Sequence, residues 1–291
     1  MTATRDPSAT SDARIDARST VGRLRTAGFT LAVLGLLALN LATTPPAVLT
    51  AAATGWVQDL GSHQVHDMTV AAGLWIALVV PLVLLLYRPR ERVNTVLAPL
   101  SIAVPTAVLA FLAGSFLFPG FAVASGLALA AVVLHPAGRS VVQFDRVASA
   151  DRRAAALLTV AAVPLVAYAG LELARQLGPV DDHVLFVHYG AMANAALFVV
   201  LMGGLAVVRR RDWRFAAWSA GLIAAFLGLA SVAYPASDSS LGTVGGALLA
   251  LWAVAFVAAV ESARRTPGED PAADEGTEPS AESVRDGATR S

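Results

Sequence analysis

Histidine is the residue type in this sequence that is best suited to binding a metal or a haem. Four of the five histidines form two pairs, His63 with His66 and His183 with His188, and each pair comes at the start of a long apolar run. Neutral imidazole is a normal ligand of haem iron, copper and zinc. The chain contains no Cys, which excludes a disulfide framework, a Cys-ligated zinc or iron–sulfur site and a thiol nucleophile.

Three interpretations of these histidines remain open. In the first, His66 and His188 face each other and ligate a haem iron, with His63 and His183 in support. In the second, the four histidines bind copper or zinc with the help of thioether ligands. The thioether candidates are Met68 and Met192. In the third, the histidines lie at the water interface of a membrane and bind nothing.

Other polar residues lie near these pairs or inside the apolar runs. Glu172 and Arg175 are three residues apart, so on a helix they can neutralise each other as an ion pair or serve a proton or ion relay. The remaining polar candidates are Asp59, which precedes the first histidine pair, and Asn40 and Asn194, which interrupt apolar runs.

Composition indicates that a membrane surrounds these residues. The chain has 291 residues, of which 56% are hydrophobic and 14% charged, whereas about 25% are charged in a typical soluble domain. A bilayer core needs about 20 helical residues. Eight apolar runs are long enough, so we predict an all-α polytopic membrane protein with eight transmembrane helices. The predicted spans are 27–43, 68–87, 95–113, 117–135, 154–174, 185–208, 214–234 and 241–261.

Arginine predicts the orientation of these spans. With the N-terminus inside, nearly all arginines between the tails fall in internal segments, and the external segments hold only Arg175. This positive-inside pattern predicts that both termini are cytoplasmic in the plasma membrane, with both histidine pairs at the extracytoplasmic face. The net charge is zero and no basic stripe occurs, so we expect no nucleic-acid partner. The lipid bilayer is the expected environment, and a homo-oligomer or a membrane-complex partner remains open.

The chain divides into two polar tails and two membrane halves. Residues 1–22 and the acidic segment 266–291 predict disordered cytoplasmic tails. Residues 23–150 and 151–265 each predict four spans, and the two halves resemble each other in layout. The first external loop predicts an amphipathic interfacial helix at about 46–61, anchored by Trp56. Prolines inside spans, such as Pro81, predict kinks.

This layout resembles heme A synthase, a membrane enzyme of two pseudo-symmetric four-helix halves with histidines at the outer ends of helices two and six. Asp59 before His63, and His183 and His188 before Ala191, are similar to that family's histidine regions. The family also carries histidines at the outer ends of helices four and eight, whereas this chain has none at 116–119 or 239–242. The resemblance therefore implies a haem-handling relative without implying heme A synthase activity.

The function expected from the sequence is haem or metal binding at the extracytoplasmic side. A transporter or permease with a path between the two halves is one alternative, and a non-catalytic subunit of a membrane complex is another. The sequence shows no phosphate loop, serine-nucleophile elbow or dinucleotide fingerprint, so it assigns no enzyme activity.

Overall fold

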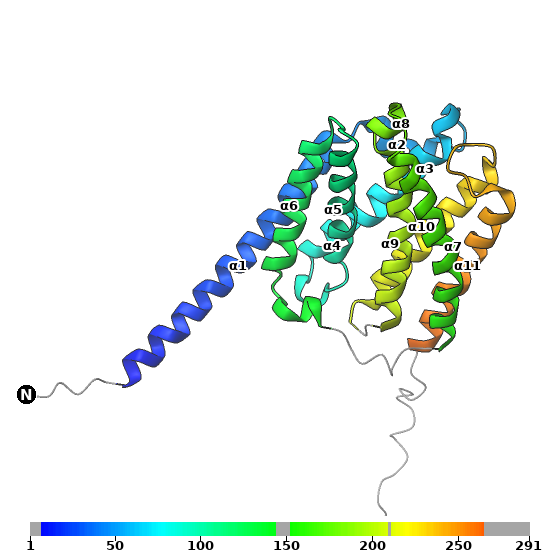
Figure 1. Cartoon of the computed structure of the whole chain (residues 1–291). Coiled ribbons are helices and arrows are strands. Elements are labelled where there is room, and N and C mark those ends of the chain that lie inside the picture. The colour runs from blue at the N-terminus through cyan, green and yellow to red at the C-terminus, as the bar shows by residue number, and fades with distance from the viewer. Residues whose placement is uncertain (1–6, 144–151, 209–210, 265–291) are drawn as a thin grey trace, which may run out of the picture.

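The computed structural model describes residues 7–143, 152–208 and 211–264, and all regular structure in these ranges is helical (Figure 1). The predicted tail at 266–291 lies outside the described residues. We call the end of the bundle that carries α2 and α8 the upper end, as drawn in Figure 1, and the opposite end the lower end.

Six helical segments within the described ranges are long and apolar enough to cross a membrane. They are Thr20–Thr43 in α1 (Pro7–Thr43), Gln64–Leu86, α7 (Arg152–Gln176), α9 (His188–Val208), α10 (Trp213–Ala233) and Gly242–Ala263 in α11 (Gly242–Arg264). The segment Gln64–Leu86 comprises α3 (Gln64–Gly73), the π-helix η2 (Leu74–Val79) and α4 (Val80–Leu86). The structure is therefore that of an all-α polytopic membrane protein.

Two of the eight predicted spans are shorter than a full crossing. They form α5 (Leu97–Leu112) and α6 (Phe118–Leu134), with 16 and 17 residues, or about 24–26 Å of helix. Gly114, whose φ is 62°, ends the first, and Pro119 lies in the first turn of the second. These two residues make the hairpin that the sequence predicts, but they also remove residues from each helix.

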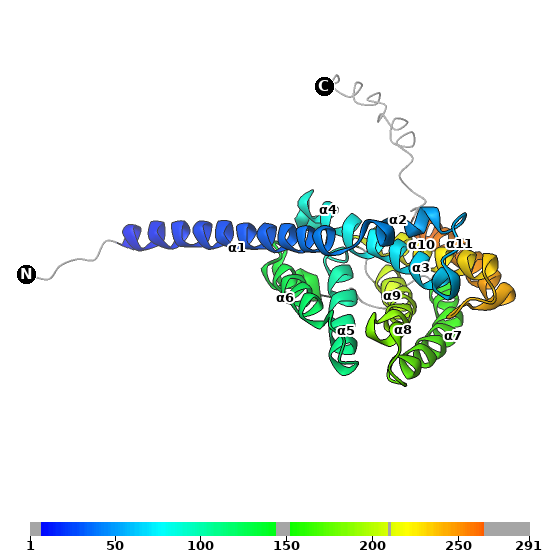
Figure 2. The same ribbon diagram turned by 90° about the horizontal axis from the view of Figure 1, so that it is seen from above.

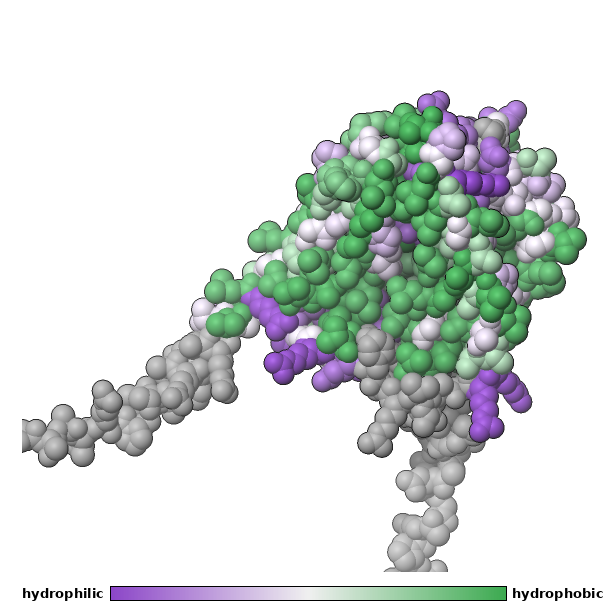
Figure 3. Space-filling model, viewed as in Figure 1, coloured by the Kyte–Doolittle hydropathy of each residue, from purple (hydrophilic) through white to green (hydrophobic). Residues whose placement is uncertain are grey.

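The surface of the bundle is what a bilayer requires. Hydrophobic side chains cover most of the face shown in Figure 3, and hydrophilic ones gather at its upper and lower ends. Large apolar side chains such as Val160, Val163 and Leu251 are about 70% exposed on the long helices. In water such a surface would cause aggregation, whereas lipid tails cover it at no cost.

Among the described residues, the helices pack around two large apolar cores, with a small third cluster at Leu109, Ala110 and Val187. One core joins α1, α4, α5 and α6, and the other joins α3, α7, α9, α10 and α11. The two groups lie side by side when seen from above (Figure 2). The segment Gln64–Leu86 connects them, because α3 packs on α9 and α10 while α4 packs on α1. Thus α3, which belongs to the first predicted half in sequence, joins the helices of the second half in space.

Small residues let α10 and α11 cross at close range. A Cβ atom added to Gly228 would lie 2.6 Å from the carbonyl oxygen of Gly246 and 2.8 Å from the backbone nitrogen of Ala250. Small residues let the two backbones approach this closely.

Three elements depart from the sequence prediction. Helix α1 begins at Pro7, so residues 7–22 are helical where we predicted a disordered tail; the alanines and arginines of this segment are good helix formers and extend the membrane helix. The loop helix α2 spans Pro46–Thr54 and ends before the predicted residue 61. It ends there because the carbonyl of Gly55 accepts hydrogen bonds from the side chains of Gln64 and Tyr234 rather than from a further helical turn.

The third departure lies in the sixth span. The predicted helix 185–208 is split into α8 (Asp182–Leu185) and α9, because Val187 adopts a left-handed backbone with φ 60°. In the second span, Pro81 follows the wide π-helical turn of η2, which accommodates the proline ring and its missing N–H group.

Candidate metal centre

The four paired histidines of the sequence meet at one point at the upper end. His63, His66, His183 and His188 each offer a ring nitrogen, and these four atoms all lie within 4.8 Å of one another. The Nδ1 atoms of His63 and His188 are 3.2 Å apart, and the rings of His63 and His183 stack with their centroids 4.3 Å apart. The sequence placed these residues in one layer, and the structure brings them into contact.

The first pair is held by the turn that precedes α3. The backbone N–H of Gly61 donates to Asp59 Oδ1 at 2.8 Å, and Gly61 itself has a φ of 62°. The side chain of Gln64 accepts from the N–H of Leu60 and donates to the carbonyl of Gln58. Asp59, which the sequence analysis named as a polar candidate near this pair, is exposed and shapes the turn.

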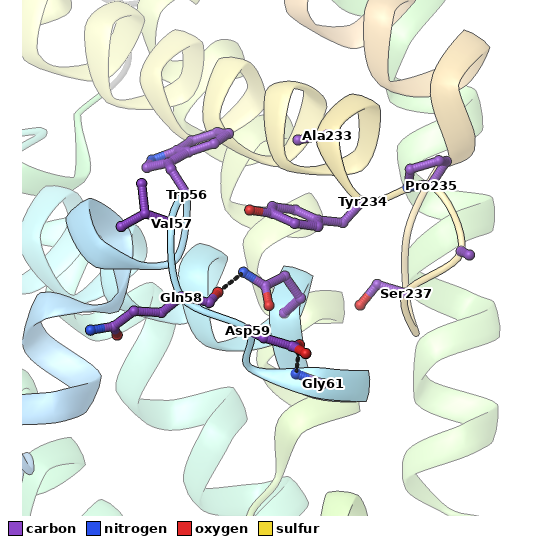
Figure 4. A pocket seen from close by; sticks show the side chains of 11 residues that line it. Trp56, Val57, Gln58, Asp59, Gly61, Ala233, Tyr234, Pro235 and Ser237 are labelled. Atoms are coloured by element: carbon purple, nitrogen blue, oxygen red, sulfur yellow. Dashed lines mark hydrogen bonds between the residues drawn. The ribbon is translucent and has the colours of Figure 1, made fainter.

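These turn residues also line an open pocket of about 720 Å³ beside the histidines. Figure 4 shows the pocket between the turn and the end of α10, with Trp56 and Tyr234 on its walls and the bond from Gly61 to Asp59 as a dashed line. The pocket is open to the surface, and none of the four histidines lines it.

The second pair is held by the break at Val187. Asp181 caps α8 by accepting from the N–H of Val184 at 2.9 Å. The buried side chain of Gln176 joins the two sides of the break, because it donates to the carbonyl of Val184 and accepts from the N–H of Gly190, both at 2.9 Å. Since α8 and α9 are separate helices, His183 can stack on His63 while His188 meets the same ring edge-on.

Two ring nitrogens in this group are buried and lack a hydrogen-bond partner, His66 Nδ1 and His183 Nε2. His66 is completely buried, and the side chain of His183 is 14% exposed. Most buried polar atoms in folded proteins have a partner, so an unpartnered one calls for an explanation. A bound cation at the centre of the group would satisfy both nitrogens at once.

A hydrogen-bonded chain supports His66 from behind. Its Nε2 lies 2.6 Å from Ser239 Oγ, and Ser239 Oγ donates to Glu172 Oε2 at 2.6 Å. Glu172 is 2% exposed and pairs with Arg175 at 2.9 Å, as the spacing of the two residues predicted. The hydroxyl of Tyr168 donates to the backbone carbonyl of Ser239 at 2.7 Å. Sequence reasoning missed Ser239, because a serine in a short polar loop looks like an ordinary turn residue.

Two carboxylates lie beside His183 and favour a positive occupant of the group. Asp181 Oδ2 lies 3.9 Å from His183 Nδ1, and Asp238 Oδ2 lies 3.9 Å from His183 Nε2. Both aspartates are about half exposed, so they face the water at the upper end. Their charges raise the local concentration of cations at the mouth of the site.

The other candidates from the sequence take packing roles. Met68 and Met192 are fully buried in the apolar core around α9, and the sulfur of Met68 lies 3.7 Å from the side-chain nitrogen of Gln64. Asn194 donates to Thr106 Oγ1 at 2.8 Å, and Asn40 accepts from Thr44 Oγ1 at 3.4 Å.

The fifth histidine, His135, lies at the other end of the molecule. It follows the last residue of α6, its Nδ1 accepts from the N–H of Ala137, and its ring meets Phe29 edge-on. Burial, and to a smaller extent the nearby Arg25, lowers the pKa of His135 to about 4, while a hydrogen bond with the backbone of Pro89 opposes this shift. His135 is thus a neutral packing residue and a useful control for the other four.

Comparison with known proteins does not assign the chain to a family. No protein-family model, no curated protein and no solved structure matches the chain. The resemblance to heme A synthase therefore stays a prediction from layout. The segment at 239–242, where that layout would place a further histidine, supplies Ser239 to the site instead.

Proposed function

We propose that this protein spans the membrane eight times, with both termini in the cytoplasm, and binds one divalent transition-metal ion at its extracytoplasmic end. The proposed ligands are His63, His66, His183 and His188, and the ion is copper(II) or zinc. The observation that carries the proposal is the convergence of four ring nitrogens within 4.8 Å, two of them on residues with an unpartnered buried nitrogen.

The spacing of the nitrogens supports a single ion. In a tetrahedral site with metal–nitrogen bonds of about 2.0–2.1 Å, neighbouring ligand atoms lie about 3.3–3.4 Å apart. The 3.2 Å between the Nδ1 atoms of His63 and His188 is close to this value. The widest pair needs to contract by no more than about 1.5 Å from the 4.8 Å limit, which small side-chain rotations supply.

The same geometry favours a bare ion over haem. A haem iron between two axial imidazoles places a wide porphyrin between their rings. His66 and His188 have ring centroids 5.7 Å apart, but the rings of His63 and His183 lie within 6.4 Å of both. A porphyrin between His66 and His188 would have to displace these two rings.

The ligand chemistry points to a borderline divalent ion. Imidazole suits copper(II) and zinc, whereas copper(I) prefers thiolate and thioether ligands. The chain has no Cys, and its two nearby methionines are in the apolar core. A set of four protein ligands leaves no open position for a reacting water, which is typical of a site that holds an ion rather than one that hydrolyses a substrate.

The arginines support the proposed orientation. At the lower end, Arg25 donates to the carbonyl of Val133, Arg92 pairs with Asp212, and Arg214 pairs with Glu261. The positive-inside rule assigns the end that is rich in arginine to the cytoplasm. The short helices α5 and α6 complete eight crossings if the bilayer thins around them or if their flanking residues reach the interface.

Metal analysis tests the proposal. The full chain is purified in detergent, stripped with a chelator, and given zinc or copper(II). We expect one ion per chain in the parent and in His135→Ala, and strongly reduced retention in His66→Ala and in His188→Ala. A colourless protein that retains no ion would contradict the proposal. A Soret band that depends on His66 and His188 would show that the site binds haem instead of a bare metal ion.

A further inference from the structure

A series of hydrogen-bonded side chains ends at His66, and each hydrogen bond in this series has a definite direction. It runs from Arg175 through Glu172 and Ser239 to His66. We propose that Glu172 and Ser239 are positioning residues, which hold His66 in the tautomer that carries its proton on Nε2 and presents the lone pair of Nδ1 to the metal ion. This inference rests on the proposed function and adds the residues that prepare one of its ligands.

The direction follows from the number of protons that each group can give. Arg175 only donates, and it occupies Oε1 of Glu172 at 2.9 Å. The carboxylate accepts the single proton of the Ser239 hydroxyl on Oε2 at 2.6 Å. Ser239 Oγ then has only lone pairs to offer His66, so the bond of 2.6 Å between Oγ and Nε2 requires the proton on Nε2. The opposite nitrogen, Nδ1, keeps a free lone pair and is the buried atom that lacks a partner.

The backbone of Ser239 supports a specific role for its hydroxyl. Ser239 has a φ of 57°, a left-handed conformation that glycine adopts freely and that most other residues adopt only with strain. It is 5% exposed, and the bond from Tyr168 to its carbonyl fixes it in place. Glycine would therefore suit the backbone here, and what serine adds is the hydroxyl group between His66 and Glu172.

Two variants disturb this hydrogen-bonded series in different ways. In Glu172→Gln, Arg175 still requires an oxygen acceptor, so the new amide places its NH₂ group toward Ser239. Ser239 Oγ then accepts from the amide and turns its own proton to His66 Nε2, which moves the histidine proton to Nδ1 and blocks the ligand atom. In Ser239→Gly, the left-handed backbone is retained without strain and the hydroxyl is lost, so no group selects the tautomer.

The experiment combines a tautomer measurement with a metal titration on the full chain in detergent. Nitrogen-15 NMR of the metal-free parent should show His66 protonated on Nε2, and Glu172→Gln should show it protonated on Nδ1. The dissociation constant for zinc should rise about 10- to 100-fold in Glu172→Gln and in Ser239→Gly. Glu261→Gln, which weakens a Glu–Arg pair at the lower end, is the matched control and should leave both measurements unchanged.

The outcomes separate this inference from the proposed function. If the parent binds zinc but carries the His66 proton on Nδ1, or if both variants bind zinc as the parent does, the positioning role is wrong and the metal site stands. If the parent has the expected tautomer but binds neither zinc nor copper(II), the proposed function is wrong. Should Glu172→Gln fail to fold, the parent tautomer and the Ser239→Gly titration still decide the question.

Discussion

Deletion of the His66 side chain should weaken metal binding by roughly two to three orders of magnitude. Four-ligand zinc sites in small domains bind with apparent free energies of about 10–16 kcal/mol, so one ligand in four accounts for about 2.5–4 kcal/mol. Since about 1.4 kcal/mol corresponds to a tenfold change in the dissociation constant, His66→Ala should raise it about 10²- to 10³-fold. We expect the lower part of this range if water enters the cavity and replaces the lost nitrogen.

The assay is competition with a chromophoric zinc chelator, run on the purified full chain at pH 7.5. His135→Ala is the matched control, because it also removes a fully buried imidazole but at the lower end. The parent and this control should share one dissociation constant. The reasoning is refuted if His66→Ala retains the parental constant, or if His135→Ala loses as much affinity as His66→Ala does.

Thermal unfolding gives an independent measure of the same loss. An ion that binds only the folded state stabilises it by about 2.7 kcal/mol when its free concentration is 100 times the dissociation constant. Zinc should therefore raise the Tm of the parent and of His135→Ala by several degrees. At the same zinc concentration, His66→Ala should show almost no shift, whatever the Tm of its metal-free form.

Three further predictions concern the scaffold. Gly228→Ala should lower stability by about 3 kcal/mol or more, because the new methyl group meets backbone atoms 2.6–2.8 Å away that cannot rotate aside. The control Gly204→Ala, whose new methyl group meets nothing within 4 Å, should leave the Tm in detergent unchanged or raise it. Equal losses in the two variants would count against this helix crossing. Asp212→Asn should cost about 2 kcal/mol. Asp212 Oδ2 accepts from the N–H and the hydroxyl of Thr95 at 2.7 Å, and Oδ1 pairs with Arg92 at 3.4 Å, so an asparagine whose oxygen replaces Oδ2 turns its NH₂ group toward the Arg92 guanidinium. An unchanged Tm would show that the pair with Arg92 carries no stability. His135→Asn should flatten the fall of stability on acidification. The pKa of His135 is about 4 in the folded protein and ordinarily 6.5, so the parent loses on the order of 3 kcal/mol of stability as the pH falls from 6.5 to 4. Identical pH profiles of Tm for the parent and the variant would refute this assignment.

The sequence predicted the helices well because hydropathy decides which segments enter a membrane. The predicted runs agree with the observed helices to within a few residues at most ends, and the break at Gly114 lies where we expected it. The errors are local. The left-handed turn at Val187 was missed because a β-branched residue gives no signal for that conformation, and the early end of α2 depends on side chains that contact Gly55 from elsewhere in the chain.

The candidate site was predicted only in part. The arginine pattern placed both histidine pairs at one end of the spans, which is why the four residues could be named from the sequence. Hydropathy does not determine how helices are arranged around one another, so it could not show that the pairs meet. Ser239 and Asp238 lie in the loop between α10 and α11, and no local pattern marks them as part of a site.

X-ray absorption spectroscopy of the zinc-loaded protein tests the central claim most directly, because it reports the atoms bound to the ion. We predict one zinc per chain with four nitrogen neighbours at about 2.0–2.1 Å and the outer-shell scattering that imidazole rings produce. The spectrum of His66→Ala should change, and that of His135→Ala should match the parent. A sulfur neighbour at about 2.3 Å, or a shell of oxygen atoms without imidazole scattering, would contradict the four-histidine site.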